Sequence, residues 1–140
     1  MNLYAETSGV LAWLLGEPDA SRVRKALAGA TTVVSSDLTL VECDRVLLRA
    51  VTLGEIAEAT AADRRARLNA VATGWHVLRV YADVVEHARH HFPAEPIRTL
   101  DALHLASALV ARQAVPGLAM LTLDTRLRAS AAALGFAMVP

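Results

Sequence analysis

The segment Asn2-Leu-Tyr-Ala-Glu-Thr-Ser-Gly-Val-Leu-Ala-Trp-Leu-Leu15 contains the pattern on which the fold rests. Its first residues are mostly apolar and few, so we predict a short buried strand over residues 2–6. Thr7 or Ser8 then supplies a hydroxyl suited to a helix N-cap, and apolar residues recur after it at helical spacing. A helix is therefore expected directly after the strand, with its apolar face formed by Val10, Leu11, Leu14 and Leu15.

The same alternation of strand and helix continues through the chain. Strands that alternate with helices predict an α/β fold of three layers, in which helices cover both faces of a short parallel sheet of about five strands. Residues 38–72 read as helix followed by helix, which predicts a helical hairpin inserted between two strands. The further strands are expected at residues 31–35, 75–80, 118–123 and 136–139, and the further helices at about residues 18–28, 37–50, 55–72, 81–91, 99–111 and 125–134.

Length and composition favour one globular domain over residues 1–140. Lys+Arg and Asp+Glu number 14 each, so the formal net charge is zero and no overall basic surface for nucleic acid is present. The single cysteine excludes an internal disulfide and a zinc site built on thiolates. No apolar run approaches the ~18 residues of a membrane span, and the N-terminus lacks the basic start of a signal peptide. We therefore expect a cytoplasmic protein with no membrane segment.

Four acidic residues stand where carboxylates carry chemistry in α/β proteins. Ligands of open parallel sheets bind beyond the carboxyl ends of the strands, and Glu6 and Asp124 lie at two such ends. Asp101 lies in a helix that is apolar nearly all round, where an unpaired carboxylate is costly. Glu42 lies inside the helix predicted for residues 37–50, near the boundary of its buried face.

Each of these acids also has a purely structural interpretation. Asp124 is placed to cap the last helix, whereas Glu6 is less suited to capping because two hydroxyl residues follow it. Asp101 pairs in this interpretation with Arg98 or with a histidine one turn along its helix. Glu42 pairs with the arginines three and seven residues further on.

A shared prediction follows if the four carboxylates converge. Their negative charges then repel one another, and only bound cations make the arrangement stable. Ligands that are all oxygen suit Mg²⁺ or Mn²⁺. Such ions deprotonate a water molecule and stabilise the charge that develops in phosphodiester hydrolysis. The candidate site of such a hydrolase consists of Glu6, Glu42, Asp101 and Asp124.

Other common sites are excluded or poorly supported. Glycine-rich phosphate loops and the G-x-S-x-G nucleophile motif are absent. His87 and His91 share a helix face, but a third zinc ligand at suitable spacing is missing, so a solvated histidine face is the better interpretation. His104 could orient Asp101 or contact phosphate, and a packed core histidine is the favoured interpretation.

Four sequence blocks together resemble a known family. They are similar to the blocks of PIN domains, and they are Tyr-Ala-Glu-Thr-Ser at 4–8, Leu-Val-Glu-Cys-Asp-Arg at 40–45, Leu-Asp-Ala-Leu-His-Leu-Ala at 100–106 and Leu-Thr-Leu-Asp-Thr-Arg-Leu at 121–127. Among these they are most similar to the VapC-like ribonuclease toxins of prokaryotic toxin–antitoxin pairs. The resemblance implies a PIN-like fold and a metal-dependent endoribonuclease that cuts RNA and is neutralised by a VapB-like antitoxin.

The resemblance also implies roles for single residues. Glu42, Asp101 and Asp124 match acidic positions of the family, which would hold Mg²⁺ or Mn²⁺ directly or through water. Thr7 and Thr122 match positions where a hydroxyl often lies near the metal. Arginines around the acids are the candidates for RNA contact, with a solvated helix residue as the alternative for each; they are Arg45, Arg98, Arg126 and Arg128.

Glu6 departs from the family pattern, which usually has Asp at this position. Glu is one methylene longer, Mg²⁺ demands near-ideal octahedral geometry, and a misplacement of about 1 Å can cost ~10²-fold in rate. Glu6 is therefore a natural variant that still binds metal, the mark of a weakened enzyme, or an introduced substitution. The alternative function is an impaired PIN-fold module that binds RNA or antitoxin without efficient cleavage.

A partner surface is expected from the high apolar content, since 54% of the residues are hydrophobic. Val10, Trp13 and Leu14 on the first helix, together with the Ala-rich hairpin, are the candidates to pack against an antitoxin segment or a second copy in a homodimer. For Val10 and Leu14, burial in the core of the chain itself is the favoured alternative.

Overall fold

Five parallel strands form one sheet at the centre of the computed structural model, which describes residues 1–140. The order across the sheet is β3-β2-β1-β4-β5, so β1 and β4 are its inner strands and pair directly. The predicted α/β class, with five parallel strands, is confirmed. The strands are β1 (Asn2–Ala5), β2 (Thr32–Ser36), β3 (His76–Leu78), β4 (Leu118–Leu121) and β5 (Met138–Val139).

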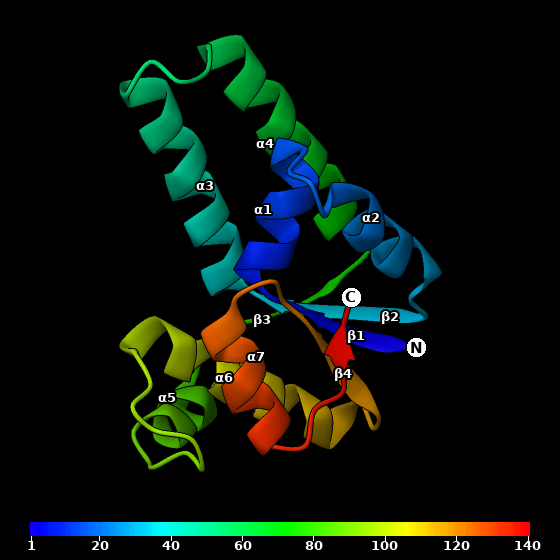
Figure 1. Ribbon diagram of the computed structural model, residues 1–140, viewed down its shortest axis with the longest axis vertical. Coiled ribbons are helices and arrows are strands. Elements are labelled where there is room, and N and C mark those ends of the chain that lie inside the picture. The colour runs from blue at the N-terminus through cyan, green and yellow to red at the C-terminus, as the bar shows by residue number, and fades with distance from the viewer.

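Helices cover both faces of this sheet, as Figure 1 shows. One face and the helices α1–α4 share a core that includes Val10, Val23 and Leu121, and the other face shares a core with α5–α7 that includes Leu105 and Met120. The predicted three layers are therefore present. The helices are α1 (Thr7–Leu15), α2 (Ala20–Gly29), α3 (Asp37–Thr52), α4 (Glu58–Ala72), α5 (Ala82–Ala88), α6 (Thr99–Ala114) and α7 (Thr125–Ala133).

The predicted helical hairpin is formed by α3 and α4, which follow one another between β2 and β3. The two helices extend well beyond the sheet in Figure 1. Ser36 accepts a hydrogen bond from the Leu38 amide and caps α3. Glu42 lies in the first half of α3, at the end of the helix that is nearer the sheet, and the rest of the hairpin continues from there to the outer surface.

Several predicted boundaries are wrong by a few residues. The second helix begins at Ala20 after an Asp19 N-cap, and not at Pro18. The third strand has three residues, because it pairs with β2 alone at the edge of the sheet. Helix α5 ends at Ala88, before His91. The residue that caps α1 is Glu6 and not Thr7 or Ser8, a difference that bears on the site.

Gly9 allows α1 to approach β4 closely. A Cβ atom at Gly9 would lie 3.2 Å from Leu121 Cγ and 3.4 Å from the Leu121 carbonyl oxygen, and Leu121 is fully buried. Only a residue without a side chain fits this spacing without displacing its neighbour. The close approach brings the first turn of α1 to the end of β4, where the candidate site lies.

The apolar residues of α1 are part of the core. Val10 and Leu14 are buried, so the alternative of core burial is confirmed for them. Trp13 is half-buried, packs against the α1–α4 core, and has the Arg67 guanidinium 5.7 Å from its ring centre. Arg67 of α4 is thus placed against an aromatic ring of α1. No helix of the structure has both the length and the apolar character that crossing a bilayer requires.

Cys43 gives a test of the packing between α3 and the sheet. Its side chain is buried, and this burial raises the pKa of the thiol to about 12. Only about one thiol in 10⁴ is then ionised at pH 8, and the thiolate is the reactive form. We expect Cys43 to react with a thiol reagent only after unfolding in urea, measured by absorbance of the released chromophore. Rapid stoichiometric labelling of the folded protein would contradict this packing.

Candidate active site at the carboxyl edge of the sheet

The candidate site lies where the strand order reverses. From β1 the chain proceeds to β2 and β3 on one side, and later to β4 and β5 on the other, so the crevice between β1 and β4 is a topological switch point. Open α/β sheets bind ligands at such points, beyond the carboxyl ends of the strands. Ala5 pairs with Leu121 across the two strands, and the Glu6 amide donates to the Leu121 carbonyl at 3.0 Å. Glu6 and Thr122 therefore emerge side by side.

The Glu6 carboxylate is held by the chain itself. Its Oε2 atom accepts hydrogen bonds from the Ser8 amide at 3.0 Å, the Ser8 hydroxyl at 2.5 Å and the Thr122 hydroxyl at 2.7 Å. Glu6 is 6% exposed, so these donors replace the water that a carboxylate would otherwise bind. The side chain thus caps α1, and the expectation that Thr7 or Ser8 caps it is wrong because Ser8 acts as donor to Glu6.

Glu42 meets α1 and α6 across the site. Its Oε1 atom accepts a hydrogen bond from the Thr7 hydroxyl at 2.8 Å, and His104 Nε2 lies 2.5 Å from the same oxygen. The Thr7 hydroxyl and His104 Nε2 are themselves 3.2 Å apart. The other ring nitrogen of His104, Nδ1, is 3.5 Å from the Tyr4 hydroxyl of β1. Side chains from β1, α1 and α3 therefore converge on one histidine of α6.

The electrostatics of Glu42 follow from these contacts. Partial burial alone raises the pKa of its carboxyl, but the hydrogen bonds from His104 and Thr7, with a smaller electrostatic attraction to the imidazole, outweigh burial and lower the pKa below its usual 4.5. Glu42 is therefore a carboxylate at neutral pH. Burial raises the pKa of Tyr4 far above its usual value of 10, so Tyr4 stays a neutral phenol. The predicted pairing of Glu42 with arginines on its own helix is absent.

Asp101 lies in the first turn of α6 and pairs with Arg98. Its Oδ2 atom is 3.3 Å from Arg98 Nε, and the two side chains are 20% and 65% exposed respectively. Such a solvated pair contributes at most about 1 kcal/mol. Of the two partners considered for Asp101, the arginine is the one observed, and His104 faces Glu42 instead.

Asp124 caps the last helix, as its position predicts. Its Oδ1 atom accepts from the Arg126 amide at 2.9 Å and the Leu127 amide at 3.0 Å. Its own amide donates to the Ser8 hydroxyl at 3.1 Å, which places its backbone beside the Glu6 donors. The Asp124 main chain is thus part of the site, while its carboxylate is directed at α7.

The four carboxylates do not form a preassembled metal cage. No group of three or more His, Cys, Asp or Glu side chains in the structure lies close enough to hold a metal ion. In this structure each of the four carboxylates instead contacts protein donors, and Glu6 and Glu42 both lie within 3.9 Å of His104 Nε2. The convergence of all four on a metal ion stays a prediction. By chemistry the set does fit Mg²⁺ or Mn²⁺, since the ligands on offer are carboxylate and hydroxyl oxygens.

The four arginines predicted to contact RNA have different surroundings. Arg98 and Arg126 line a pocket of about 340 Å³ together with Asp101 and Ser130. Arg128 turns inward, donating to the Thr122 carbonyl at 2.8 Å and the Pro140 carbonyl at 3.3 Å. The guanidinium thus holds the residue that follows β4, and its role in RNA contact stays a prediction.

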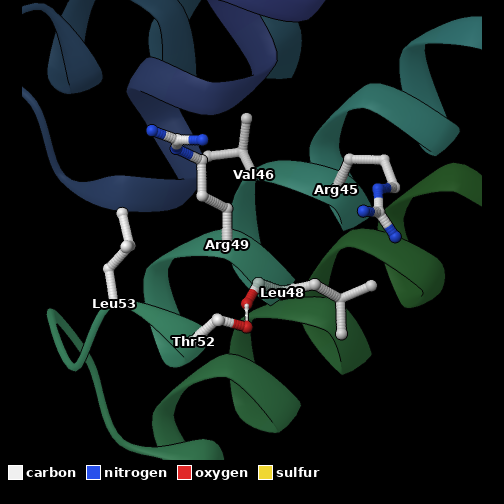
Figure 2. Close-up of a pocket in the computed structure, with 6 residues that line it drawn as sticks. All are labelled: Arg45, Val46, Leu48, Arg49, Thr52 and Leu53. Carbon is white, nitrogen blue, oxygen red and sulfur yellow. Dashed lines mark hydrogen bonds between the residues drawn. The ribbon is translucent and has the colours of Figure 1, made fainter.

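Arg45 lies on the outer side of α3, where it lines a different hollow together with Arg49. Figure 2 shows the two guanidinium groups extending in different directions from the helix, with Thr52 and Leu53 further along it. Neither arginine forms a salt bridge in the structure. Arg45 is therefore free to meet an anion, at a place one turn beyond Glu42.

Sequence reasoning missed two residues of the site and misjudged a third. Ser8 was considered only as a cap, yet its hydroxyl joins Glu6 to the Leu123 and Asp124 amides. Tyr4 was considered only as part of a strand. His104 was expected to pack in the core or to serve Asp101; it is buried, but it contacts Glu42. The only sequence signal that His104 belongs to the site is its place on the same helix face as Asp101.

Comparison with known protein families agrees with this fold and with these blocks. The family model of the PIN domain matches residues 3–133, nearly the whole chain. The chain therefore belongs to the PIN-domain family, and the resemblance drawn from its sequence blocks is confirmed.

Individual relatives are named VapC. Ribonuclease VapC46 of Mycobacterium tuberculosis is 33% identical over 98% of this chain and 95% of its own length. The crystal structure of M. tuberculosis VapC20, a toxin that cleaves the sarcin–ricin loop, covers 99% of both chains with a TM-score of 0.67 at 19% identity. A toxin–antitoxin complex from Klebsiella pneumoniae covers 100% of this chain and 97% of its own, with a TM-score of 0.65 at 18% identity. At these identities the two structures show a shared fold.

Ser8 gives a test of the hydrogen bonds around Glu6. In Ser8→Ala the Leu123 amide loses its hydroxyl acceptor and Glu6 loses a donor, so we expect unfolding to become easier by about 1–3 kcal/mol, measured in urea. Ser130→Ala is the matched control, because its hydroxyl bonds only a carbonyl of its own exposed helix. It should change stability by less than about 0.5 kcal/mol. Equal effects of the two variants would contradict the proposed geometry.

Proposed function

We propose that this protein is an endoribonuclease toxin that hydrolyses RNA phosphodiester bonds and is neutralised by an antitoxin. The family match over residues 3–133 carries this proposal. The relatives named ribonucleases cover nearly the whole chain, and an acidic crevice at the switch point is the expected place for a substrate. We infer that the chain acts as a single domain in the cytoplasm, where RNA is found.

PIN-domain ribonucleases need a divalent metal ion, and we propose Mg²⁺ or Mn²⁺ for this chain. The proposed ligands are Glu6, Glu42, Asp101 and Asp124, with Thr7 and Thr122 in support through their hydroxyls. When bound, such an ion supplies charge stabilisation and an activated water. The Arg98–Asp101 pair is exposed and weak, so it offers little resistance to a competing cation.

The residues of the chain itself would bind and orient the RNA backbone. Arg98 and Arg126 flank the pocket that Asp101 lines, so a phosphate there meets two guanidinium groups beside a carboxylate. Arg45 lies one turn beyond Glu42 on α3 and would meet the backbone on the other side of the crevice. With so few cations and no net charge, binding should weaken only modestly with salt.

A second function is favoured by one observation, the state of Glu6. Its carboxylate is longer than the aspartate usual in the family, and its Oε2 atom already has three donors. On this alternative, the chain is an impaired PIN-fold module that binds RNA or antitoxin without efficient cleavage.

We propose the groove between α3 and α4 as the antitoxin surface. It has a volume of about 710 Å³ and is lined mainly by small and apolar residues, among them Leu48, Val51, Ala62 and Ala66. Leu48 is 51% exposed and lies beside Val51 and Ala66 in this lining, so a partner that covered the groove would bury a contiguous apolar surface. The Ala-rich hairpin is thus a better candidate than Val10 and Leu14, which are buried. A homodimer is a further proposal on the same apolar grounds.

Asp101→Asn tests the nuclease proposal. We expect the wild type to cleave single-stranded RNA in Mn²⁺ and to lose this activity in EDTA. We expect Asp101→Asn to be slower by about 10²-fold or more, because a neutral amide is a poor ligand for a hard cation. Product formation is followed on denaturing gels.

Asp63→Asn is the matched control for this experiment, since Asp63 is an exposed acid on α4 away from the site. It should cleave at the rate of the wild type. Cleavage that survives EDTA, or that is unchanged in Asp101→Asn, would contradict a metal site at Asp101.

Glu6→Asp separates the two candidate functions. If Glu6 weakens the enzyme by its length, the shorter side chain should raise the cleavage rate by about 10-fold or more. If Glu6 is a working variant, the substitution should lower the rate, because Asp reaches Ser8 and Thr122 less well. Rates are compared in Mn²⁺ at equal protein concentration, after melting curves show that both proteins are folded.

A further inference from the structure

His104 is a buried polar residue whose ring faces three polar groups. Its side chain is 2% exposed. Nε2 lies 2.5 Å from Glu42 Oε1 and 3.2 Å from the Thr7 hydroxyl, and Nδ1 lies 3.5 Å from the Tyr4 hydroxyl. A histidine that served only to fill space would leave these nitrogens without partners, which is costly in a buried position. Both nitrogens instead point at groups of complementary chemistry.

The partners determine which nitrogen carries the hydrogen. Glu42 as a carboxylate can only accept, so the hydrogen of the short contact must come from Nε2. Tyr4 as a phenol can donate to Nδ1, which accepts in the Nε2–H tautomer. The Thr7 hydroxyl donates to Glu42 Oε1 and presents its oxygen to Nε2–H. This arrangement satisfies Glu42, Thr7 and Nε2, and it leaves Nδ1 free to accept from the Tyr4 hydroxyl, which also has Ser107 and Ser36 as neighbours.

His104 also stands between two of the acids. The second oxygen of Glu6, Oε1, lies 3.9 Å from His104 Nε2, and Glu42 Oε1 lies 2.5 Å from the same nitrogen. Glu42 has three rotatable side-chain bonds and is partly exposed, with 26% of its side chain accessible. Without a fixed donor it can turn toward water. A rigid imidazole attached to a buried helix therefore restricts Glu42 to the rotamer that contacts Nε2, the atom that also lies 3.9 Å from Glu6 Oε1.

We propose that His104 is a positioning residue, which holds the Glu42 carboxylate in the crevice through Nε2–H while the Tyr4 hydroxyl fixes the tautomer. This inference rests on the proposed function for its effect on cleavage, and on the geometry alone for its effect on Glu42. It differs from the sequence expectation that His104 serves Asp101 or the core.

The first test compares His104→Gln with His104→Leu. The Gln amide can place a donor near the position of Nε2, whereas Leu has similar bulk and no donor. We expect the dissociation constant for Mn²⁺, measured by titration calorimetry, to rise by about 10- to 100-fold in His104→Leu, with most of the affinity retained in His104→Gln. Cleavage of RNA should follow the same order. Melting curves establish that both variants are folded.

The second test begins with the wild-type protein and leaves the His104 side chain in place. The ¹⁵N chemical shifts of the His104 ring in the wild type should show hydrogen on Nε2 and none on Nδ1 at neutral pH in metal-free protein. Glu42→Gln should shift the Nε2 resonance, and Tyr4→Phe should allow the other tautomer to appear. A ring with hydrogen on Nδ1, or an Nε2 resonance indifferent to Glu42→Gln, overturns the proposal.

The outcomes separate the two proposals. If a folded His104→Leu binds Mn²⁺ and cleaves RNA like the wild type, the positioning role is wrong and the nuclease function stands. If the wild type neither binds Mn²⁺ nor cleaves RNA, the nuclease function is wrong, and the ring resonances alone decide the role of His104. Equal loss of Mn²⁺ affinity in folded His104→Gln and His104→Leu also overturns the proposal, because the donor would then be irrelevant.

Discussion

The burial of a carboxylate at the end of β1 is the constraint on which this site depends. A charged group removed from water must be given donors, and Glu6 receives them from Ser8 on α1 and from Thr122 after β4. These bonds tie the start of α1 to the neighbouring strand, and the absence of a side chain at Gly9 makes the approach possible. The same contacts bring the backbone of Asp124 into the crevice.

Two hydrogen-bonded groups therefore divide the acidic crevice between them. One consists of Glu6 with Ser8 and Thr122, and the other of Glu42 with Thr7 and His104. Thr7 and Ser8 are neighbours on α1. Thr7 belongs to the Glu42 group and Ser8 to the Glu6 group, so the backbone of α1 connects the two groups. Hydroxyls and one imidazole supply the donors in this part of the site, far in sequence from Lys25, the single lysine of the chain.

The sequence predicts the architecture well because local signals determine it. The short apolar runs, the glycine stops and the caps at Ser36 and Asp124 are each readable within a few residues, and the strand count and the inserted hairpin follow from them. The hydrogen-bond partners of Glu6 and Glu42 cannot be predicted from such local signals. His104 and Glu42 are 62 residues apart, and their contact depends on how α3 and α6 pack on opposite faces of one sheet. The Asp101–Arg98 pair lies within one helix turn, and it was accordingly among the partners expected.

The cap at the start of α7 would couple the proposed metal site to the order of a helix end. One oxygen of Asp124, Oδ1, accepts hydrogen bonds from both the Arg126 and the Leu127 amides. Loss of such a cap costs about 0.5–2 kcal/mol, so a cation that drew Oδ1 away from these amides would loosen the first turn of the helix. Arg126 is attached to that turn and lines the pocket beside Asp101. Cation binding at Asp124 and the freedom of the Arg126 side chain would then be linked through two peptide N–H groups.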